Sequence, residues 1–184
     1  MNFNYQGYEL KFIQKKPCRD ESAHLFTIVF KFYSPVTKYF YVLHADYHDE
    51  DIFAIKFYCK KDKRSKYKYS KLVNRGDVGN ILITCLKVLP LLLPQYPTAS
   101  FSFVGSRTLD PVSQKLESYI NNQRFRMYVY IVAKKIGVQT FTHLQYEHIS
   151  GYVLLNNNSK DLIAKEAAIV AMFQNTYHSV HDIA

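Results

Sequence analysis

The 184-residue sequence contains no tryptophan and only three cysteines, Cys18, Cys59 and Cys85. Their odd number and unpaired spacing exclude a disulfide framework and a cysteine-based zinc site, so we expect free thiols in a reducing cytoplasm. The longest apolar run, residues 88–93, is far too short to span a bilayer. The N-terminal stretch also lacks the continuous apolar core of a signal peptide. These absences predict a cytoplasmic protein that does not enter the membrane.

Acidic residues are few as well, because 15 Asp and Glu stand against 24 Lys and Arg, and the net charge is +9. Such a charge attracts phosphate-bearing partners and does not choose among nucleic acid, a nucleotide cofactor and anionic lipid. Sixteen tyrosines and thirteen phenylalanines favour a β-rich core over a stacking surface for ligands or bases. The length and the apolar share of 48% predict one domain over residues 1–184.

The N-terminal half alternates apolar and polar residues as strands do. Within residues 23–33, Phe26 and Ile28 face one way, while Thr27 and Val29 face the other. The turns between such segments are too short for a helical crossover, so we predict an antiparallel meander. The expected strands cover residues 5–14, at the sheet edge, and residues 23–33, 38–47 and 52–60.

Helical patterns begin in the second half. Apolar residues recur at three- and four-residue spacing from Val78 to Leu89, which predicts a buried helix ended by Pro90 and Pro94. The longest helical pattern covers residues 112–135.

Gly137 is the expected C-cap of that long helix, and Asn121 and Asn122 leave open a short helix followed by a longer one. The other expected elements are strands at 99–104, 139–146 and 150–156 and a terminal helix over 160–177, capped by Ser159. No repeat or linker appears, so the N-terminal strands (1–37) and the C-terminal helix (159–184) belong to the same domain.

The stretch from Tyr69 to Arg107 organises this prediction as strand, polar turn with Gly76 and Gly79, helix and second strand. A helix that begins right after a glycine turn aims free backbone N–H groups and the positive end of its dipole at one point. That point is a candidate anion site for a cofactor. Its residues are Asn74, Arg75, Gly76, Val78, Gly79 and Asn80.

The segment from Lys60 to Lys71 carries seven basic residues with Tyr67 and Tyr69 between them. A basic hairpin tip or edge strand is one interpretation, since lysines on an edge discourage aggregation. Contact with a polyanion is the other, because basic residues with interleaved tyrosines suit a phosphate backbone and stacked bases. The candidate nucleic-acid contacts are Lys63, Arg64, Lys66, Tyr67, Lys68 and Arg124.

From Tyr39 to Asn156 the order of elements resembles the GCN5-related N-acetyltransferase superfamily. The resemblance implies an α+β fold, with a mostly antiparallel central sheet flanked by helices. It also implies a strand that splays from its neighbour, with acyl-coenzyme A in the gap. In that family a Gln/Arg-x-x-Gly-x-Gly/Ala turn holds the pyrophosphate. Here the turn from Arg75 to Asn80 has the arginine and two glycines at a different spacing, and includes Asp77, the expected N-cap.

The resemblance further implies a tyrosine that protonates the leaving thiolate. This role falls on Tyr128 if Asn121 is aligned with the family's asparagine, and on Ala133 if Gly137 is the anchor, so the register stays open. Glu147 is the expected base for an amine acceptor. Other candidate bases are Asp46, His48, Asp49, Glu50 and His148. His143 and His148 lack a third ligand at a suitable spacing, so no metal site is expected.

These features predict an acyl-coenzyme A dependent N-acyltransferase that uses acetyl-coenzyme A, or a degenerate relative that keeps the fold. One version is a bacterial toxin of a toxin–antitoxin pair that acts on aminoacylated transfer RNA, because the basic surface suits RNA. Protein amines are a second acceptor class. The alternative is a non-catalytic module that binds nucleic acid or an acidic protein through residues 60–71. Whether the chain forms a homodimer is left open.

Overall fold

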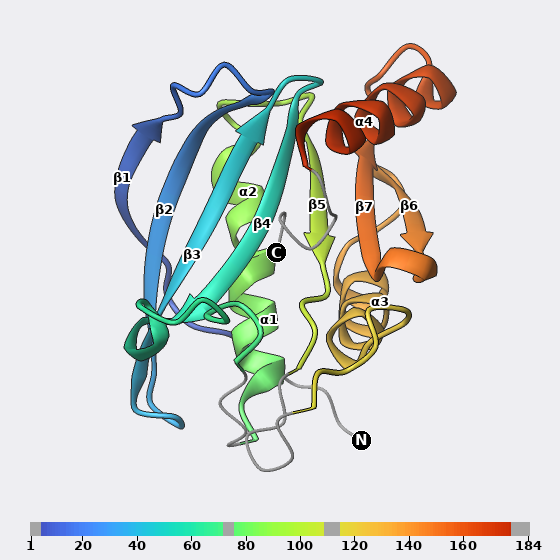
Figure 1. Ribbon diagram of the computed structural model, residues 1–184. Helices are drawn as coiled ribbons and strands as arrows, with labels where there is room; N and C mark the ends of the chain where they lie inside the picture. Colours follow the sequence, from blue (N-terminus) through green and yellow to red (C-terminus); the bar gives the residue numbers. More distant parts are fainter. Residues whose placement is uncertain (1–4, 72–75, 109–114, 178–184) are drawn as a thin grey trace.

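The structure is a computed structural model, and it describes residues 5–71, 76–108 and 115–177 (Figure 1). Seven strands form one sheet in the order β1-β2-β3-β4-β5-β7-β6. All neighbouring strands are antiparallel except β4 and β5, which are parallel. The α+β class and the mostly antiparallel sheet are therefore as predicted.

The first four strands form the predicted meander: β1 (Lys11–Pro17), β2 (His24–Ser34), β3 (Tyr39–His48) and β4 (Ile52–Cys59). Alternation decides which side chains reach the core, because successive residues of a strand point to opposite faces. Phe30, Leu43 and Phe57 pack into the main core. The residues that follow Leu43 and precede Phe57, His44 and Lys56, point to the other face.

The connection from β4 to β5 (Ser100–Val104) runs through α1 (Val78–Leu86) and α2 (Val88–Leu92). This long crossover is what allows β4 and β5 to lie parallel. Pro90 does not end the helix as predicted; it lies in the first turn of α2, where its missing N–H is not needed. The predicted strand at Tyr69 is also wrong, because this residue lies in a turn.

The second half contains α3 (Gln123–Lys135), β6 (Phe141–Tyr146), β7 (Gly151–Asn156) and α4 (Leu162–Thr176). The longer helix predicted from residue 112 is wrong in its first part: α3 begins only at Gln123, and residues 112–114 lie outside the described residues.

Two predicted caps differ from the observed ones, and the N-cap of α3 was not predicted. Asn122 caps α3, where its Oδ1 accepts the N–H of Phe125 at 2.9 Å, and Ile136 rather than Gly137 is the C-cap. Asp161, not Ser159, caps α4. Ile136 and Asp161 both lie close in sequence to the caps that were predicted. The predicted C-terminus of α3 and the predicted N-terminus of α4 were therefore wrong by only a few residues.

Helices cover the two faces of the sheet unequally. The main core lies between the sheet and α1, α2 and α3. On the opposite face α4 packs over part of the sheet, where Ile169 and Met172 contact Ile52, Val153 and Leu155. Figure 1 shows α4 over the β4, β5 and β7 side, and no described helix over β1, β2 and most of β3. We call this uncovered surface the open face.

Gly105 allows the chain after β5 to approach the start of α3. A Cβ at this position would lie 2.4 Å from Asn122 Oδ1 and 2.9 Å from the backbone nitrogen of Phe125. The Asn122 side chain also donates to the Gly105 carbonyl, so both partners are fixed. We expect Gly105→Ala to lower the free energy of unfolding by about 2–3 kcal/mol, as measured by urea denaturation.

Gly137→Ala is the matched control for this substitution. Gly137 is exposed, and a Cβ there would have nothing within 4 Å. Its free energy of unfolding should change by less than about 0.5 kcal/mol. Equal effects of the two substitutions would show that the close approach at Gly105 does not matter.

Candidate functional site

The parallel strands β4 and β5 pair over only part of their length. Four residue pairs join them, from Ile52 with Ser100 to Ile55 with Phe103. β4 then continues from Lys56 to Cys59, still paired with β3 but no longer with β5. Figure 1 shows the two strands diverging beyond the paired part. This divergence leaves an unpaired strand edge inside the sheet, which we call the β4–β5 gap.

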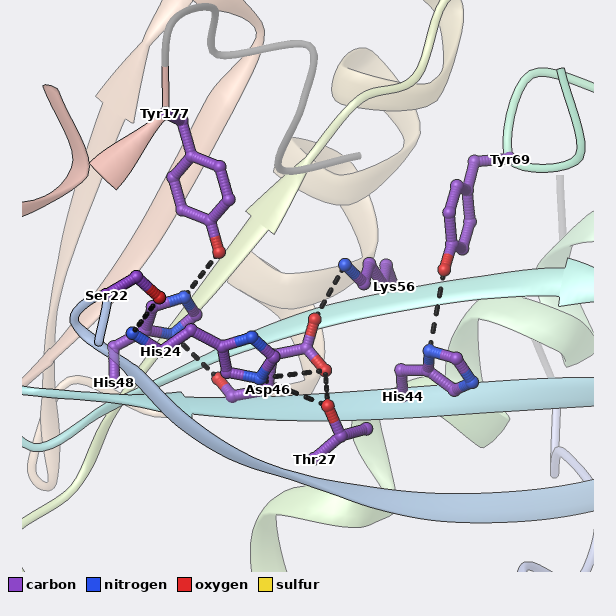
Figure 2. Close-up of polar contacts among 9 residues, drawn as sticks. All are labelled: Ser22, His24, Thr27, His44, Asp46, His48, Lys56, Tyr69 and Tyr177. Carbon is purple, nitrogen blue, oxygen red and sulfur yellow. Dashed lines mark hydrogen bonds and ion pairs between the residues drawn. The ribbon is translucent and has the colours of Figure 1, made fainter. Parts of the chain in front are cut away.

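A group of polar side chains crosses the open face and reaches the start of this gap at Lys56; Figure 2 shows the group. We call it the polar stripe, and its members are His24, Thr27, His44, Asp46, His48 and Lys56. Its centre is Asp46, which is 1% exposed. The Asp46 carboxylate pairs with Lys56 Nζ at 2.6 Å, accepts the Thr27 hydroxyl at 2.5 Å, and lies 3.7 Å from His24 Nε2.

The Asp46 carboxylate stays charged despite its burial. Burial by itself raises the pKa of Asp46, but the Lys56 ammonium and the Thr27 hydroxyl lower it by more, and the net pKa lies below its ordinary value. His24 Nε2 also lies 3.1 Å from the Thr27 hydroxyl, so the imidazole is oriented by two groups of the stripe. The Asp46 carboxylate thus provides a fixed, buried negative charge next to His24, whose side chain is 20% exposed.

The two remaining histidines of the stripe are held neutral. Burial, with a smaller contribution from the neighbouring His24, lowers the pKa of His48 to about 4. His48 is held between the Asp46 carbonyl, 2.9 Å from Nδ1, and the Tyr177 hydroxyl, 2.5 Å from Nε2. Burial likewise lowers the pKa of His44 to about 4, and its Nδ1 lies 3.4 Å from the Tyr69 hydroxyl.

These shifted pKa values predict a stability that falls with acid. At a pH above the ordinary histidine pKa of 6.5, His44 and His48 are neutral in both the folded and the unfolded chain. As the pH falls from 6.5 to about 4, His44 and His48 become protonated in the unfolded chain but stay neutral in the folded chain. The free energy of unfolding therefore decreases. Each histidine contributes at most about 1.4 kcal/mol per pH unit.

Urea denaturation at pH 7.0, 5.5 and 4.5 measures this slope. His44→Gln should reduce the slope because it removes one of the two groups that take up protons on unfolding. A stability that stays constant from pH 7 to pH 4.5 would contradict the prediction.

Arg124 lies on the helix-covered side of the same gap. It is 4% exposed, donates from Nη1 to the Tyr69 carbonyl at 2.7 Å, and lies 5.2 Å above the ring of Phe57, which belongs to the unpaired part of β4. Its Nε is buried and has no hydrogen-bond partner among the described residues. No described carboxylate forms an ion pair with it. A buried guanidinium with an unused donor therefore borders the β4–β5 gap.

A cavity of about 350 Å³ opens on the α4 side of the polar stripe. β5 and β7 form its floor through Ser102, Val104 and Val153, and α4 closes it from above. Tyr177, which contacts His48, is part of its wall. The cavity is mostly apolar and adjoins the polar stripe, as a binding site for a small ligand would.

The first turn of α1, where we predicted the anion site, is covered by the N-terminal segment of the chain. A Cβ at Gly79 would lie 2.3 Å from the Tyr5 ring, and the Gly7 N–H donates to Asn80 Oδ1. Asp77 does occupy the N-cap position, but its side chain does not cap the helix.

Instead the Asp77 carboxylate accepts the hydroxyls of Tyr8 and Ser34 and the amide of Asn80. It is 1% exposed, so it places a buried carboxylate where the phosphate was expected. Gly76 and Val78 flank it, and Asn74 and Arg75 lie outside the described residues.

The two residues expected to act in catalysis lie in different surroundings. Tyr128 is 2% exposed and packs against Phe103, with ring centroids 5.2 Å apart. Burial raises the pKa of its hydroxyl, and Cys85 adds to the effect. Glu147 is exposed in a short 3₁₀ turn, η2 (Glu147–Ile149). Asp46 and His48, weighed at the sequence level beside Glu147, are the residues that the structure brings into the polar stripe.

The basic segment 60–71 is not the edge or hairpin tip that one interpretation required. It begins with a 3₁₀ turn, η1 (Lys60–Asp62), and continues as turns after β4, an interior strand. Lys63, Arg64 and the residues at 66 and 67 are exposed, and Lys68 is partly buried. Arg124, the sixth expected nucleic-acid contact, lies in the interior instead.

Sequence reasoning did not identify His24, Thr27 and Lys56 as functional residues. The one available signal was alternation, which places Thr27, Asp46 and Lys56 on the non-core face of three adjacent strands. Within the described residues, no group of three or more His, Cys, Asp or Glu side chains is placed to hold a metal ion. No helix in the described ranges is long and apolar enough to cross a membrane. Comparisons with protein-family models, curated proteins and solved structures gave no match.

Proposed function

We propose that this protein is an acyl-coenzyme A dependent N-acyltransferase. The observation that carries the proposal is the parallel pair β4–β5, which separates after Ile55 while β4 continues to Cys59. A strand edge that its neighbour leaves unpaired suits an extended amide-containing chain such as the pantetheine arm. The sheet order and the crossover through α1 support the same expectation, because the resemblance to the acetyltransferase superfamily implied a splayed strand at this point.

The residues beside the gap fit an anionic cofactor with polar amides. Arg124 donates from Nη1 to the Tyr69 carbonyl, but its buried Nε has no acceptor among the described residues, and no described carboxylate pairs with its charge. Leaving such a donor unpaired is costly unless a ligand supplies the acceptor. Tyr5 and Tyr8 cover the first turn of α1. We therefore assign cofactor binding to the β4–β5 gap rather than to residues 74–80.

Acyl-coenzyme A, when bound, supplies an activated acyl thioester. The protein's part is to orient an amine and accept its proton. We assign the proton to His24, whose imidazolium would face the Asp46 carboxylate 3.7 Å away. Lys56 and Thr27 hold that carboxylate in place. The cavity under α4 adjoins the stripe and receives the apolar part of the acyl group or of the acceptor.

Calorimetric titration with acetyl-coenzyme A tests the proposal, with coenzyme A and dephospho-coenzyme A as comparison ligands. Saturable binding is expected for the wild type. His24→Gln should keep this binding but slow the release of free thiol from acetyl-coenzyme A when a mixture of primary amines is supplied, by about 100-fold or more. Absence of saturable binding at millimolar ligand would overturn the proposal.

A further inference from the structure

A second hollow, of about 490 Å³, lies on the open face between strands β1 to β4 and the segment that follows β4. Lysines line two of its sides. β1 and β2 contribute Lys16 and Lys31, and the opposite side contributes Lys60, Lys63 and Lys68. We call this hollow the basic groove. Its position is determined by the segment 60–68, which folds back over the open face instead of continuing as a strand.

In the described part of the chain, no carboxylate forms an ion pair with any of these five lysines. The residues that line the groove include neither Asp nor Glu. The ion pairs recorded between described residues involve Lys56, Lys71 and His24 only. Two lysines of the groove instead contact aromatic rings: Lys31 lies 3.8 Å above Phe40, and Lys68 lies 5.0 Å from the ring of Tyr58.

The crowding of like charges is visible in the titration of the groove. Burial lowers the pKa of Lys68, and the ammonium groups of Lys56 and Lys63 lower it further, while the Asp46 carboxylate has a smaller opposite effect. The pKa of His44, in the floor, is lowered mainly by burial; Asp46 raises it, and Lys56, Lys68 and Lys16 lower it. A negatively charged ligand would relieve this repulsion, so the groove favours an anion over a neutral or cationic partner.

The aromatic side chains distinguish among anions. Tyr58 forms part of the groove floor beneath Lys68. Tyr33 and Phe40, neighbours on β2 and β3, are 43% and 44% exposed, and their ring centroids are 5.0 Å apart. Phe40 lies next to the groove, because Lys31, which lines the groove, lies over the Phe40 ring. Exposed flat rings beside a lysine-lined groove suit nucleobases, whereas a carboxylate-rich peptide would use the lysines alone.

We propose that the basic groove binds single-stranded nucleic acid, with the five lysines on its phosphates and the exposed rings of Tyr33 and Phe40 as platforms for its bases. A volume of about 490 Å³ lies within the range of small-ligand sites, so the groove holds a short stretch of the strand. The groove shares His44 with the polar stripe and Tyr58 with the unpaired part of β4, but its five lysines belong to neither. The inference does not depend on acyl transfer.

Fluorescence anisotropy with a fluorescein-labelled 12-nucleotide RNA of mixed sequence tests the inference. The groove variant is Lys16→Gln/Lys31→Gln/Lys63→Gln. The control is Lys135→Gln/Lys160→Gln/Lys165→Gln, which has the same net charge but changes lysines of α3 and α4 and of the residues before α4. The groove variant should bind at least tenfold more weakly than the control in 50 mM salt. Its plot of log affinity against log salt should be shallower by about 2.

Phe40→Ala tests the stacking platform separately. Affinity should fall about fivefold or more while the salt dependence stays unchanged, because stacking releases no counterions. Thermal unfolding of each variant verifies that the fold is intact. Equal losses in the groove and control variants would overturn the inference. Binding of polyglutamate as tight as that of RNA, unaffected by Phe40→Ala, would overturn it too and assign the groove to acidic proteins.

Discussion

Asp46→Ala is expected to lower the free energy of unfolding by about 2–4 kcal/mol, since it removes one partner of a largely buried ion pair. Asp46 is 1% exposed and Lys56 is 19% exposed at the side chain. The substitution leaves the Lys56 ammonium without its counter-charge and the Thr27 hydroxyl without its acceptor. The partial exposure of Lys56 places the effect below the value for a fully buried pair. Urea denaturation at pH 7 measures the loss.

A double-mutant cycle separates the ion pair from the loss of packing. Lys56→Met in the Asp46→Ala background should recover part of the stability, because it removes the charge left unpaired. Asp49→Ala is the matched control, since Asp49 is exposed in the adjoining turn. It should change stability by less than about 0.5 kcal/mol. If Lys56→Met further destabilised Asp46→Ala, the ion pair would not be the source of the effect.

Arg124→Met is expected to have opposite effects on folding and on binding. Replacing a buried charge that lacks a described carboxylate partner by a long apolar side chain should leave stability unchanged or raise it by about 1–3 kcal/mol. The same substitution removes the free donor beside the β4–β5 gap. Affinity for acetyl-coenzyme A should then fall about tenfold or more, as expected for loss of a charge-assisted hydrogen bond.

Arg126 provides the comparison, because it lies on the same helix and is exposed. Arg126→Met should alter neither the urea midpoint nor the affinity measured by calorimetry. A stabilised Arg124→Met protein with full affinity would show that Arg124 plays no part in cofactor binding. A loss of more than about 2 kcal/mol in the unliganded protein would show that its charge is satisfied without a ligand.

The sheet was predictable because alternation and turn length can be recognised within short segments of the sequence. Alternation predicted the strands at residues 23–33 and 38–47, and along residues 23–33 it also predicted which side chains share a face. Short turns then required antiparallel neighbours. The ends of the helices were less predictable. Whether Pro90 ends a helix or lies in its first turn, and whether Asn122 caps a helix or interrupts one, depends on a shift of a few residues that periodicity does not resolve.

The polar stripe was not predictable as a group because its contacts join different strands. Asp46 meets Lys56 only through the register of β3 and β4, in which Asp46 lies opposite Ala54 and His44 lies opposite Lys56. Arg124 illustrates a second reason. Two residues apart on a helix, Arg124 and Arg126 cannot share a face, but periodicity does not say which of them is buried. Arg124 is held by the carbonyl of Tyr69, which is 55 residues earlier in the chain.

The contact between His48 and Tyr177 has a consequence for the order of folding. These two residues are separated by 129 positions, and the Tyr177 hydroxyl closes the stripe from the end of α4. The meander formed by β1 to β4 involves near neighbours, so it can assemble while a ribosome is still making the later residues. Within the meander the His48 ring already stacks on His24, and its contacts with Phe173 and Tyr177 form only when α4 docks. A nascent chain therefore leaves that side of the imidazole open to water until the last described helix docks.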